Sequence, residues 1–231
     1  MSRGAHIHFS KTRDLPKPSA YVQALLGEFS HWAFDEERAK DFKDQWRSKV
    51  FEKPEFTPLD LEIGTGNGFH FAHYAQKHPD RLLMGIELKY KPLIQSIRRA
   101  RRAGCENARM VRYNAALLAD LFAPGELDRV MVHFPDPWEK LRQQKHRLIQ
   151  PEFMRLCHQL QRPGSQFEFK TDSADYFAWA KEVFSSSPYE ILALSEDLHH
   201  SAYAESNFIT HFERIFLRQG LPIHYALLRR P

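Results

Sequence analysis

The fold is decided by one stretch, Leu59-Asp60-Leu61-Glu62-Ile63-Gly64-Thr65-Gly66-Asn67-Gly68. It begins with apolar residues that alternate with acids, and this period-two pattern predicts a β-strand over 59–63. Three glycines at alternate positions follow, which allow a sharp turn and leave room for a ligand against the main chain. Residues 69–77 then have the composition of a helix. Strand, glycine turn and helix predict a nucleotide-type site at the first β–α connection of an open sheet, and a turn without a ligand is the alternative.

Strands and helices alternate through the rest of the chain. After 59–63, we expect parallel strands at 81–87, 108–112, 127–134 and 165–171, with helices between them. The end is rich in strands, and 208–216 and 223–228 are expected to pair across Gln219-Gly220-Leu221-Pro222. This order predicts an α/β fold with a mostly parallel, seven-stranded sheet and an antiparallel C-terminal hairpin. Such a Rossmann-like sheet is the architecture of class I S-adenosylmethionine-dependent methyltransferases.

Residues 1–53 form an N-terminal extension in this interpretation, and 54–231 form the main domain. The segment 11–18 is polar, basic and interrupted by proline, which indicates an extended arm. Residues 35–51 are compatible with a helix that packs Phe42, Trp46 and Val50 on the core, because these apolar residues recur every four positions. A basic arm that folds over a substrate is the alternative.

Composition narrows the class of protein. The chain has 231 residues, of which 42% are hydrophobic, and no apolar run approaches the roughly 18 residues of a membrane span. The start of the chain lacks the apolar region of a signal peptide. Cys105 and Cys157 lie far apart without a CxxC motif, and the 13 histidines form no H-x3-H pattern with a supporting acid. We therefore expect no disulfide framework, no metal site and a cytoplasmic location.

Two acids indicate which cofactor the glycine turn binds. Glu87 ends the second strand 19 residues beyond Gly68, where a Rossmann-like site places the carboxylate that binds ribose hydroxyls. Glu62 directly precedes the turn, where a carboxylate repels a pyrophosphate but suits the ammonium and sulfonium groups of S-adenosylmethionine. The spacing Gly64-x-Gly66-x-Gly68 also differs from the G-x-G-x-x-G turn of dinucleotide sites. S-adenosylmethionine is the predicted cofactor, and a buried acid paired with a basic residue is the alternative for Glu62.

Two basic segments border the predicted crevice. The helix over 89–103 carries six cations without local acidic partners, which indicates either an RNA-facing surface or a solvated helix face. The net charge of +4 adds only weak support for a polyanionic partner. The loop after strand 127–134 holds Asp136 between two prolines, followed by Trp138 and a basic tail. This run predicts a preorganised carboxylate beside a phosphate-binding surface that comprises Lys140, Arg142, Lys145 and Arg147.

With these motifs the chain resembles the bacterial tRNA (guanine-N7-)-methyltransferases, which modify a guanosine at position 46 in the variable loop. The resemblance covers about 59–228. The matching segments are 62–68, 85–87, 134–138 with the basic tail through 147, 150–153, 170–172 and 210–213. The glycine motif is shared by many methyltransferases, whereas Phe134-Pro135-Asp136-Pro137-Trp138 is far more specific.

The resemblance implies roles for individual residues. Glu62, Gly64, Gly66, Gly68 and Glu87 would bind the cofactor, together with Asn114, which stands where the family usually has an aspartate near the adenine. Asp136 would lie at the junction of cofactor and target base as the catalytic residue. Substrate-binding positions would be Lys140, Asp172, Thr210, His211, Phe212 and Glu213. The basic tail departs from the family at Gln143, Gln144 and His146.

The expected chemistry needs no general base. Guanine N7 has a lone pair and no proton, so the rate must come from aligning N7 with the methyl group and from carboxylates that stabilise the cationic product. Asp172 or Glu213 would accept hydrogen bonds from the guanine edge, and the choice between them stays open at this point. The alternatives are a methyltransferase for small molecules and a non-catalytic RNA-binding protein. The oligomeric state, monomer or homodimer, also stays open.

Overall fold

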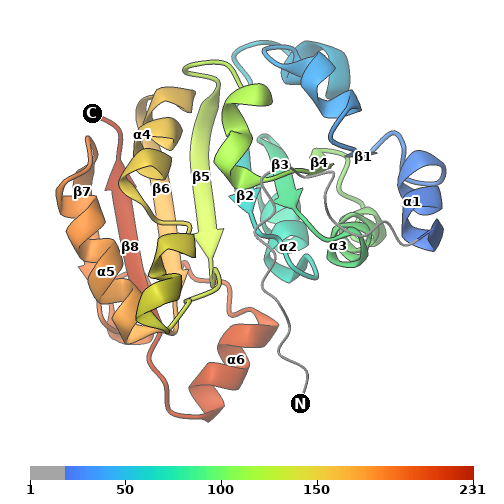
Figure 1. Ribbon diagram of the computed structural model, residues 1–231. Helices are drawn as coiled ribbons and strands as arrows, with labels where there is room; N and C mark the ends of the chain where they lie inside the picture. The colour runs from blue at the N-terminus through green and yellow to red at the C-terminus, as the bar shows by residue number, and fades with distance from the viewer. Residues whose placement is uncertain (1–18) are drawn as a thin grey trace.

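The computed structural model describes residues 19–231, without the side chains of Ser19 and His211. The expected basic arm at 11–18 lies outside the described residues. The described chain forms one sheet with helices on both faces, as Figure 1 shows.

The sheet has eight strands in the order β1-β4-β3-β2-β5-β6-β8-β7. Every neighbouring pair from β1 to β6 is parallel, and β8 is antiparallel to both β6 and β7. The strands are β1 (Ala33–Phe34), β2 (Leu59–Ile63), β3 (Leu82–Glu87), β4 (Ala108–Arg112), β5 (Leu127–His133), β6 (Gln161–Thr171), β7 (Glu190–Ser195) and β8 (His224–Arg229). Because the chain order reverses between β2 and β5, a crevice is expected outside the carboxyl ends of these two strands.

Helices cover both faces of the sheet. On one face lie α1 (Ser19–Leu26), α2 (Phe69–Lys77) and α3 (Tyr90–Arg102), which share an apolar core with β3, β4 and β5. On the other face lie the 3₁₀ segment η4 (Ala115–Asp120), α4 (Pro151–Leu160) and α5 (Ala174–Ser185), over the larger core cluster. Helix α6 (His211–Arg218) lies at the end of the sheet toward which the parallel strands point, at the bottom of Figure 1. Two further 3₁₀ segments are η5 (Leu141–His146) and η6 (Leu198–His200).

The α/β class, the mostly parallel sheet and the antiparallel C-terminal end are confirmed, with two differences. The sheet has eight strands instead of seven, and they include an unexpected two-residue edge strand, β1, which pairs with β4. The strand expected over 208–216 is wrong, since that segment forms α6. Thr210 and Glu213 make a reciprocal capping box that stabilises the helix start. The antiparallel pairing of β8 is therefore made with β6 and β7.

The segment 35–51 forms two short turns instead of one helix. They are the 3₁₀ segment η2 (Arg38–Phe42) and the π-helical turn η3 (Trp46–Val50). Asp44 interrupts them with φ +61°, a left-handed conformation that a continuous helix cannot contain. The expected packing is confirmed, because Trp46 and Val50 are buried and Phe42 packs against the same core. The boundary at residue 53 stays a prediction, although the part of the extension from residue 33 onward contributes to the sheet and the core.

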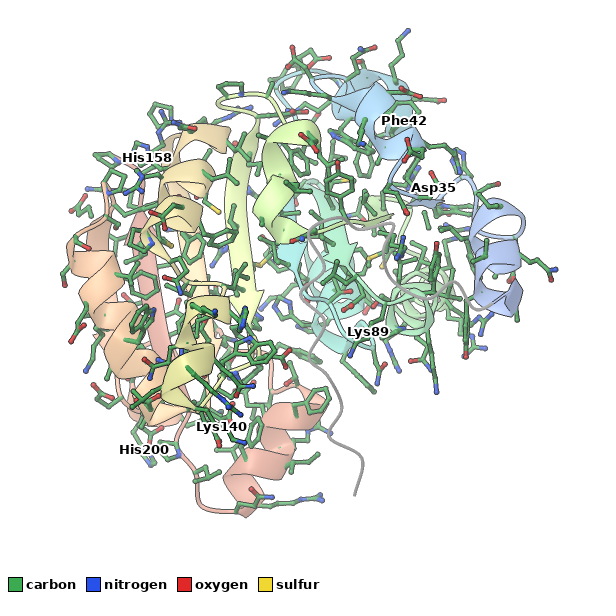
Figure 2. The ribbon with its side chains drawn as sticks, viewed as in Figure 1. Asp35, Phe42, Lys89, Lys140, His158 and His200 are labelled. Atoms are coloured by element: carbon green, nitrogen blue, oxygen red, sulfur yellow. The ribbon has the colours of Figure 1, made fainter. Side chains whose placement is uncertain are left out.

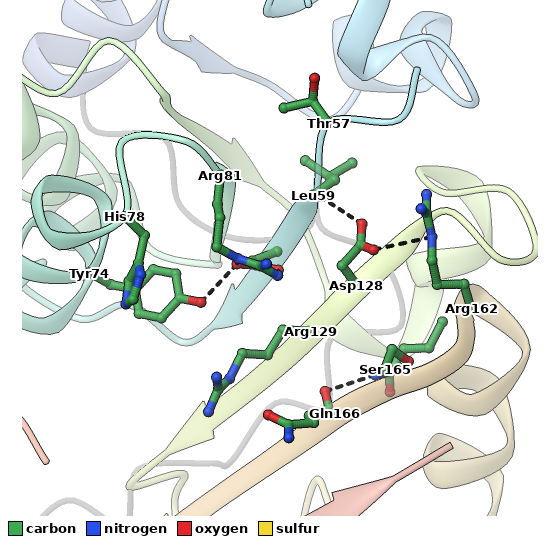
Figure 3. Close-up of polar contacts among 12 residues, drawn as sticks. Thr57, Leu59, Tyr74, His78, Arg81, Asp128, Arg129, Arg162, Ser165 and Gln166 are labelled. Atoms are coloured by element: carbon green, nitrogen blue, oxygen red, sulfur yellow. Dashed lines mark hydrogen bonds and ion pairs between the residues drawn. The ribbon is translucent and has the colours of Figure 1, made fainter. Parts of the chain in front are cut away.

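One carboxylate aligns the amino ends of the central strands. Asp128, at the start of β5, accepts a hydrogen bond from the Leu59 backbone N–H of β2 at 2.8 Å. It also pairs with Arg162 of β6 at 3.2 Å (Figure 3) and with Arg47 at 3.1 Å. Strands β2, β5 and β6 therefore start in a fixed relation, and this relation sets where their carboxyl ends meet.

No helix in the described part of the chain is both long enough and apolar enough to cross a membrane.

Candidate functional site

The glycine turn connects β2 to α2 and opens toward solvent. The backbone N–H of Gly64 donates to the Ile86 carbonyl at 2.8 Å, which joins the turn to the end of β3. A Cβ atom on Gly68, at φ +75°, would lie 2.4 Å from the Ser96 Cα, so this glycine permits the close packing of α2 and α3. A Cβ atom on Gly64 would meet no described atom within 4 Å. That open space fits the main-chain approach of a ligand.

The two predicted cofactor acids lie beside this turn. Glu62 is only 3% exposed, and its Oε2 lies 2.8 Å from Nδ1 of His70. Because an ionised carboxylate only accepts hydrogen bonds, Nδ1 carries the proton and donates. The partner of Glu62 is thus a histidine, and the second oxygen, Oε1, can face a ligand.

Glu87 joins the turn to the end of β3. Its two oxygens accept hydrogen bonds from the backbone N–H groups of Gly66 at 3.2 Å and Lys89 at 3.1 Å. Burial raises the pKa of Glu87, and these N–H groups act in the opposite direction.

Five polar residues lie at, or just after, the carboxyl ends of five adjacent strands. In the spatial order β4, β3, β2, β5 and β6 they are Asn114, Glu87, Glu62, Asp136 and Asp172. The Oδ1 atom of Asn114 accepts the backbone N–H of Ala116 at 3.0 Å and so caps η4. The structure therefore brings three predicted cofactor residues, the predicted catalytic residue Asp136 and the candidate substrate residue Asp172 to one edge of the sheet.

The loop after β5 holds Asp136 in a strained backbone. Phe134 and Trp138 have φ values of +52° and +46°, which are uncommon for residues other than glycine. Such strain persists only where the surrounding structure enforces it, and it is frequent at functional sites. Asp136 itself is exposed, and the Trp138 ring packs 5.3 Å from the ring of His146. The loop therefore presents a carboxylate at the edge without covering it.

Arg147 is the support of this loop. It is 2% exposed, its Nε donates to the Pro137 carbonyl at 2.8 Å, and its Nη2 pairs with Asp175 of α5. Its guanidinium lies over the ring of Tyr176 at 5.0 Å. Arg147 thus lies under the loop, away from the surface on which we expected it, whereas Lys140, Arg142 and Lys145 are exposed.

The expectation that the cations of α3 lack acidic partners is wrong. Arg101 pairs with Glu106 at 2.5 Å, and Arg98 lies 4.0 Å from Glu28. Arg99 stacks over the Phe69 ring at 3.6 Å. Lys89, Lys91 and Arg102 remain exposed. In Figure 2, Lys89 and Lys140 both lie toward the lower end of the molecule, the end with α6.

The two carboxylates proposed for the guanine edge differ in their surroundings. Glu213 is fully buried, and its oxygens accept hydrogen bonds from the Thr210 backbone N–H at 3.3 Å and from Asn207 Nδ2 at 2.5 Å. Asp172 is half-buried just after β6, forms no ion pair with a described side chain, and burial raises its pKa. Asp172 is therefore the carboxylate available to a base. Phe212 is exposed on α6, and the side chain of His211 lies outside the described part.

Sequence reasoning missed a buried polar cluster beneath this edge. His133 Nε2 lies 2.9 Å from Glu168 Oε1, and Glu168 also pairs with Arg129 and Lys170. Burial and the nearby Lys170 lower the pKa of His133 to about 3, whereas its hydrogen-bonded and cationic neighbours hold the pKa of Glu168 well below its usual range. The signal in the sequence is spacing, because Arg129 and His133 lie four apart in β5 and Glu168 and Lys170 lie two apart in β6. Each pair therefore falls on one face of its strand.

The cluster borders a cavity of about 250 Å³ between α2, the strands β5, β6 and β8, and the segment 198–208. Within the described chain, no group of three or more His, Cys, Asp and Glu side chains could hold a metal ion.

We predict that acidification weakens the binding of S-adenosylhomocysteine. This loss of affinity should begin at a higher pH than it would for a glutamate with an ordinary pKa. In this prediction ionised Glu87 would accept hydrogen bonds from the ribose hydroxyls, and its charge is lost as the pH falls through a pKa raised above 4.5. Calorimetry between pH 7.5 and 5 measures this, with circular dichroism to verify folding. Glu87→Gln should bind about tenfold more weakly at neutral pH and lose this pH dependence. An unchanged pH profile in the variant would contradict the assignment.

Comparison with known proteins shows which family this chain resembles. Residues 57–226 match the profile of a family described as putative methyltransferases. A tRNA (guanine-N(7)-)-methyltransferase of Bdellovibrio bacteriovorus is 52% identical over 207 residues, covering 90% of this chain and 99% of the relative. The protein of the same name from Bacillus licheniformis is 33% identical over 204 residues, covering 88% and 93%.

Solved structures show the same fold at low sequence identity. The 16S rRNA methyltransferase KamB superimposes with a TM-score of 0.57 at 16% identity, covering 81% of this chain and 92% of that one. TrmN from Thermus thermophilus has a TM-score of 0.55 at 16% identity, covering 81% and 48%. With the matching profile and the relative at 52% identity, the chain belongs to the tRNA (guanine-N(7)-)-methyltransferase family.

Proposed function

We propose that this protein transfers the methyl group of S-adenosylmethionine to N7 of a guanosine in tRNA, at position 46 of the variable loop. The observation that carries the proposal is the juxtaposition of two loops on neighbouring strands. The glycine turn follows β2, and the Pro135-Asp136-Pro137 loop follows β5, which pairs with β2 in parallel. A methyl donor held by one loop would therefore face a base held by the other.

The residues present fit S-adenosylmethionine. When bound, this group supplies an electrophilic methyl on a positively charged sulfur. Glu62 and Glu87 provide negative charge on both sides of the turn, which favours a cationic ligand and opposes a pyrophosphate. The open space at Gly64 and Gly66 allows main-chain contact, since a Cβ atom on either glycine would meet nothing within 4 Å among the described residues.

Asp136 acts on charge and position and does not remove a proton. Guanine N7 attacks with its own lone pair, and the product ring becomes cationic. The exposed carboxylate, held by two prolines and by the buried Arg147, stabilises that developing charge without reorganising. Alignment of N7 with the methyl group and sulfur provides the rest, a positioning effect of up to roughly 7–11 kcal/mol.

Asp172 selects guanine over adenine. A carboxylate accepts hydrogen bonds from the guanine N1–H and N2–H₂ groups, whereas adenine presents an acceptor at N1 and no amino group at position 2. Because Asp172 has no ion pair with a described residue, its oxygens can turn to the base. Glu213 instead holds the start of α6.

Exposed cations at the same end of the molecule bind the tRNA backbone. Lys140, Arg142 and Lys145 follow the Asp136 loop, and Lys89 precedes α3. Their charges favour a phosphate backbone, and this binding should weaken with salt. A small-molecule methyltransferase is the second candidate, but it does not account for these cations. Free, buried Cys105 and Cys157 and a tRNA substrate support a cytoplasmic location as part of the proposal.

We predict that the protein methylates bulk unmodified tRNA and that aniline cleavage maps the product to N7 of guanosine 46. Incubation with labelled S-adenosylmethionine provides the measurement. Asp136→Ala should lower the turnover number about 100-fold while the affinity for S-adenosylhomocysteine changes little. Near-full methylation by this variant would disprove the role of Asp136. Label found in a metabolite fraction and absent from tRNA would disprove the proposed substrate.

We predict that Asp172→Asn lowers kcat/KM for tRNA about 100-fold, because an amide group places a donor against guanine donors. The affinity for S-adenosylhomocysteine should stay within about twofold, since Asp172 does not contact the cofactor in this proposal. Glu139→Gln is the matched control, because it removes an exposed carboxylate from the neighbouring loop. If both variants behave alike, Asp172 does not read the base.

A further inference from the structure

A buried polar chain connects the cofactor side of the crevice to the helix on its RNA side. We use this name for seven residues: Glu62, His70, His133, Glu168, Lys170, Asn207 and Glu213. They come from β2, α2, β5, β6, the segment before α6, and α6 itself. Three are acids and one is a lysine, so a substantial amount of charge lies within the fold.

The cofactor end of the buried polar chain is the pair Glu62 and His70. His70 Nδ1 donates to Glu62 Oε2 at 2.8 Å, and the side chains are 11% and 4% exposed. The hydrogen bond fixes one carboxylate oxygen of Glu62 against α2. His70 therefore sets the orientation of Glu62.

The middle of the buried polar chain links α2 to β5 and β6. The His70 ring meets the His133 ring edge to face, with centroids 4.4 Å apart. His133 Nε2 donates to Glu168 Oε1 at 2.9 Å, and Lys170 Nζ lies 3.9 Å from the same oxygen. The contact between the two histidines is ring packing without a hydrogen bond. The buried polar chain can therefore fix side-chain positions, but it does not carry a proton from one end to the other.

Asn207 bridges the two buried charges at the RNA end. Lys170 Nζ donates to Asn207 Oδ1, and Asn207 Nδ2 donates to Glu213 Oε1 at 2.5 Å. Lysine only donates and a carboxylate only accepts, so an amide satisfies both partners in a single orientation. His199 Nε2 also lies 2.9 Å from Glu213 Oε1.

Glu213 is a residue through which α6 is buried against the rest of the fold. Among the described side chains of α6, it is the one that is buried, at 0% exposure, while the apolar residues of the helix are exposed or half-buried. The position of α6 on the sheet thus depends strongly on a carboxylate and its partners. Because Lys170 of β6 lies two residues before Asp172, which directly follows that strand, the bridge also places α6 relative to the proposed guanine reader.

We propose that His70 and Asn207 are positioning residues at the two ends of one buried polar chain. His70 holds Glu62 for the cofactor, Asn207 holds α6 for the tRNA, and His133 makes the two ends one unit. This inference rests on the proposed roles of Glu62 and of the α6 edge.

The test measures two equilibrium dissociation constants for each variant. The constant for S-adenosylhomocysteine is measured by calorimetry, and the constant for unmodified tRNA is measured by band shift. Asn207→Asp places a carboxylate against Glu213, so the tRNA constant should rise about tenfold while the S-adenosylhomocysteine constant stays within about twofold. Asn207→Ala removes both hydrogen bonds without adding charge, and it should give the same direction if the aspartate variant folds poorly. His70→Phe keeps the ring contact but removes the donor, so the S-adenosylhomocysteine constant alone should rise about tenfold.

Two further variants test the chain as a unit and separate position from stability. His133→Phe should raise both constants about threefold, because it removes the hydrogen bond to Glu168 from the middle. His70→Asn, whose amide donor replaces Nδ1–H, should restore most of the S-adenosylhomocysteine affinity. Glu190→Gln, in the exposed pair with Arg229, is the control and should change neither constant.

A fall in both affinities in every variant, in parallel with melting temperature, would overturn the inference, as would a His133→Phe protein with both constants unchanged. Methylation by the wild-type protein is measured in the same preparations. If the wild type does not methylate tRNA, the proposed function fails, while the pattern of binding constants still decides whether the positioning residues act as stated.

Discussion

The site depends on the parallel pairing of β2 with β3 on one side and with β5 on the other. Parallel strands end at the same edge, so residues that are far apart in sequence reach one crevice. The pairing of β5 with β6 extends this edge to Asp172. Asp128 aligns the opposite ends of the same strands, so the register that forms the crevice is set away from the chemistry.

Charge is arranged differently on the two sides of the crevice. The acids of the cofactor side, Glu62 and Glu87, are buried or half-buried and held by hydrogen bonds, which suits a small cationic ligand. The cations of the proposed RNA side are exposed, which suits a phosphate backbone that varies in position. Asp136 follows β5 on a strained loop, and in the proposed reaction its fixed carboxylate would act on charge that develops during transfer.

The sequence predicted the glycine turn and the Asp136 loop because both are local patterns with strong backbone preferences. The predictions from sequence were wrong where tertiary contacts determine the local structure or the position of a side chain. The segment 208–216 is rich in aromatic and β-branched residues, as strands often are, but the capping box of Thr210 and Glu213 stabilises a helix there. Arg147 belongs to a basic run, yet it folds under the loop against Asp175 and Tyr176. His70, His133 and Asn207 carry no motif, and only the fold brings them together.

The most direct test of this account is a crystal structure of the protein with S-adenosylhomocysteine. The account predicts the ligand at the carboxyl ends of β2 and β3, with its amino group at Glu62, its ribose at Glu87 and the Asp136 loop beside the sulfur. The space where a methyl group would project should open toward Asp172, wide enough for a base atom roughly 3–3.5 Å from the methyl position. A ligand bound elsewhere, or a sulfur directed away from the Asp136 loop, would contradict the account.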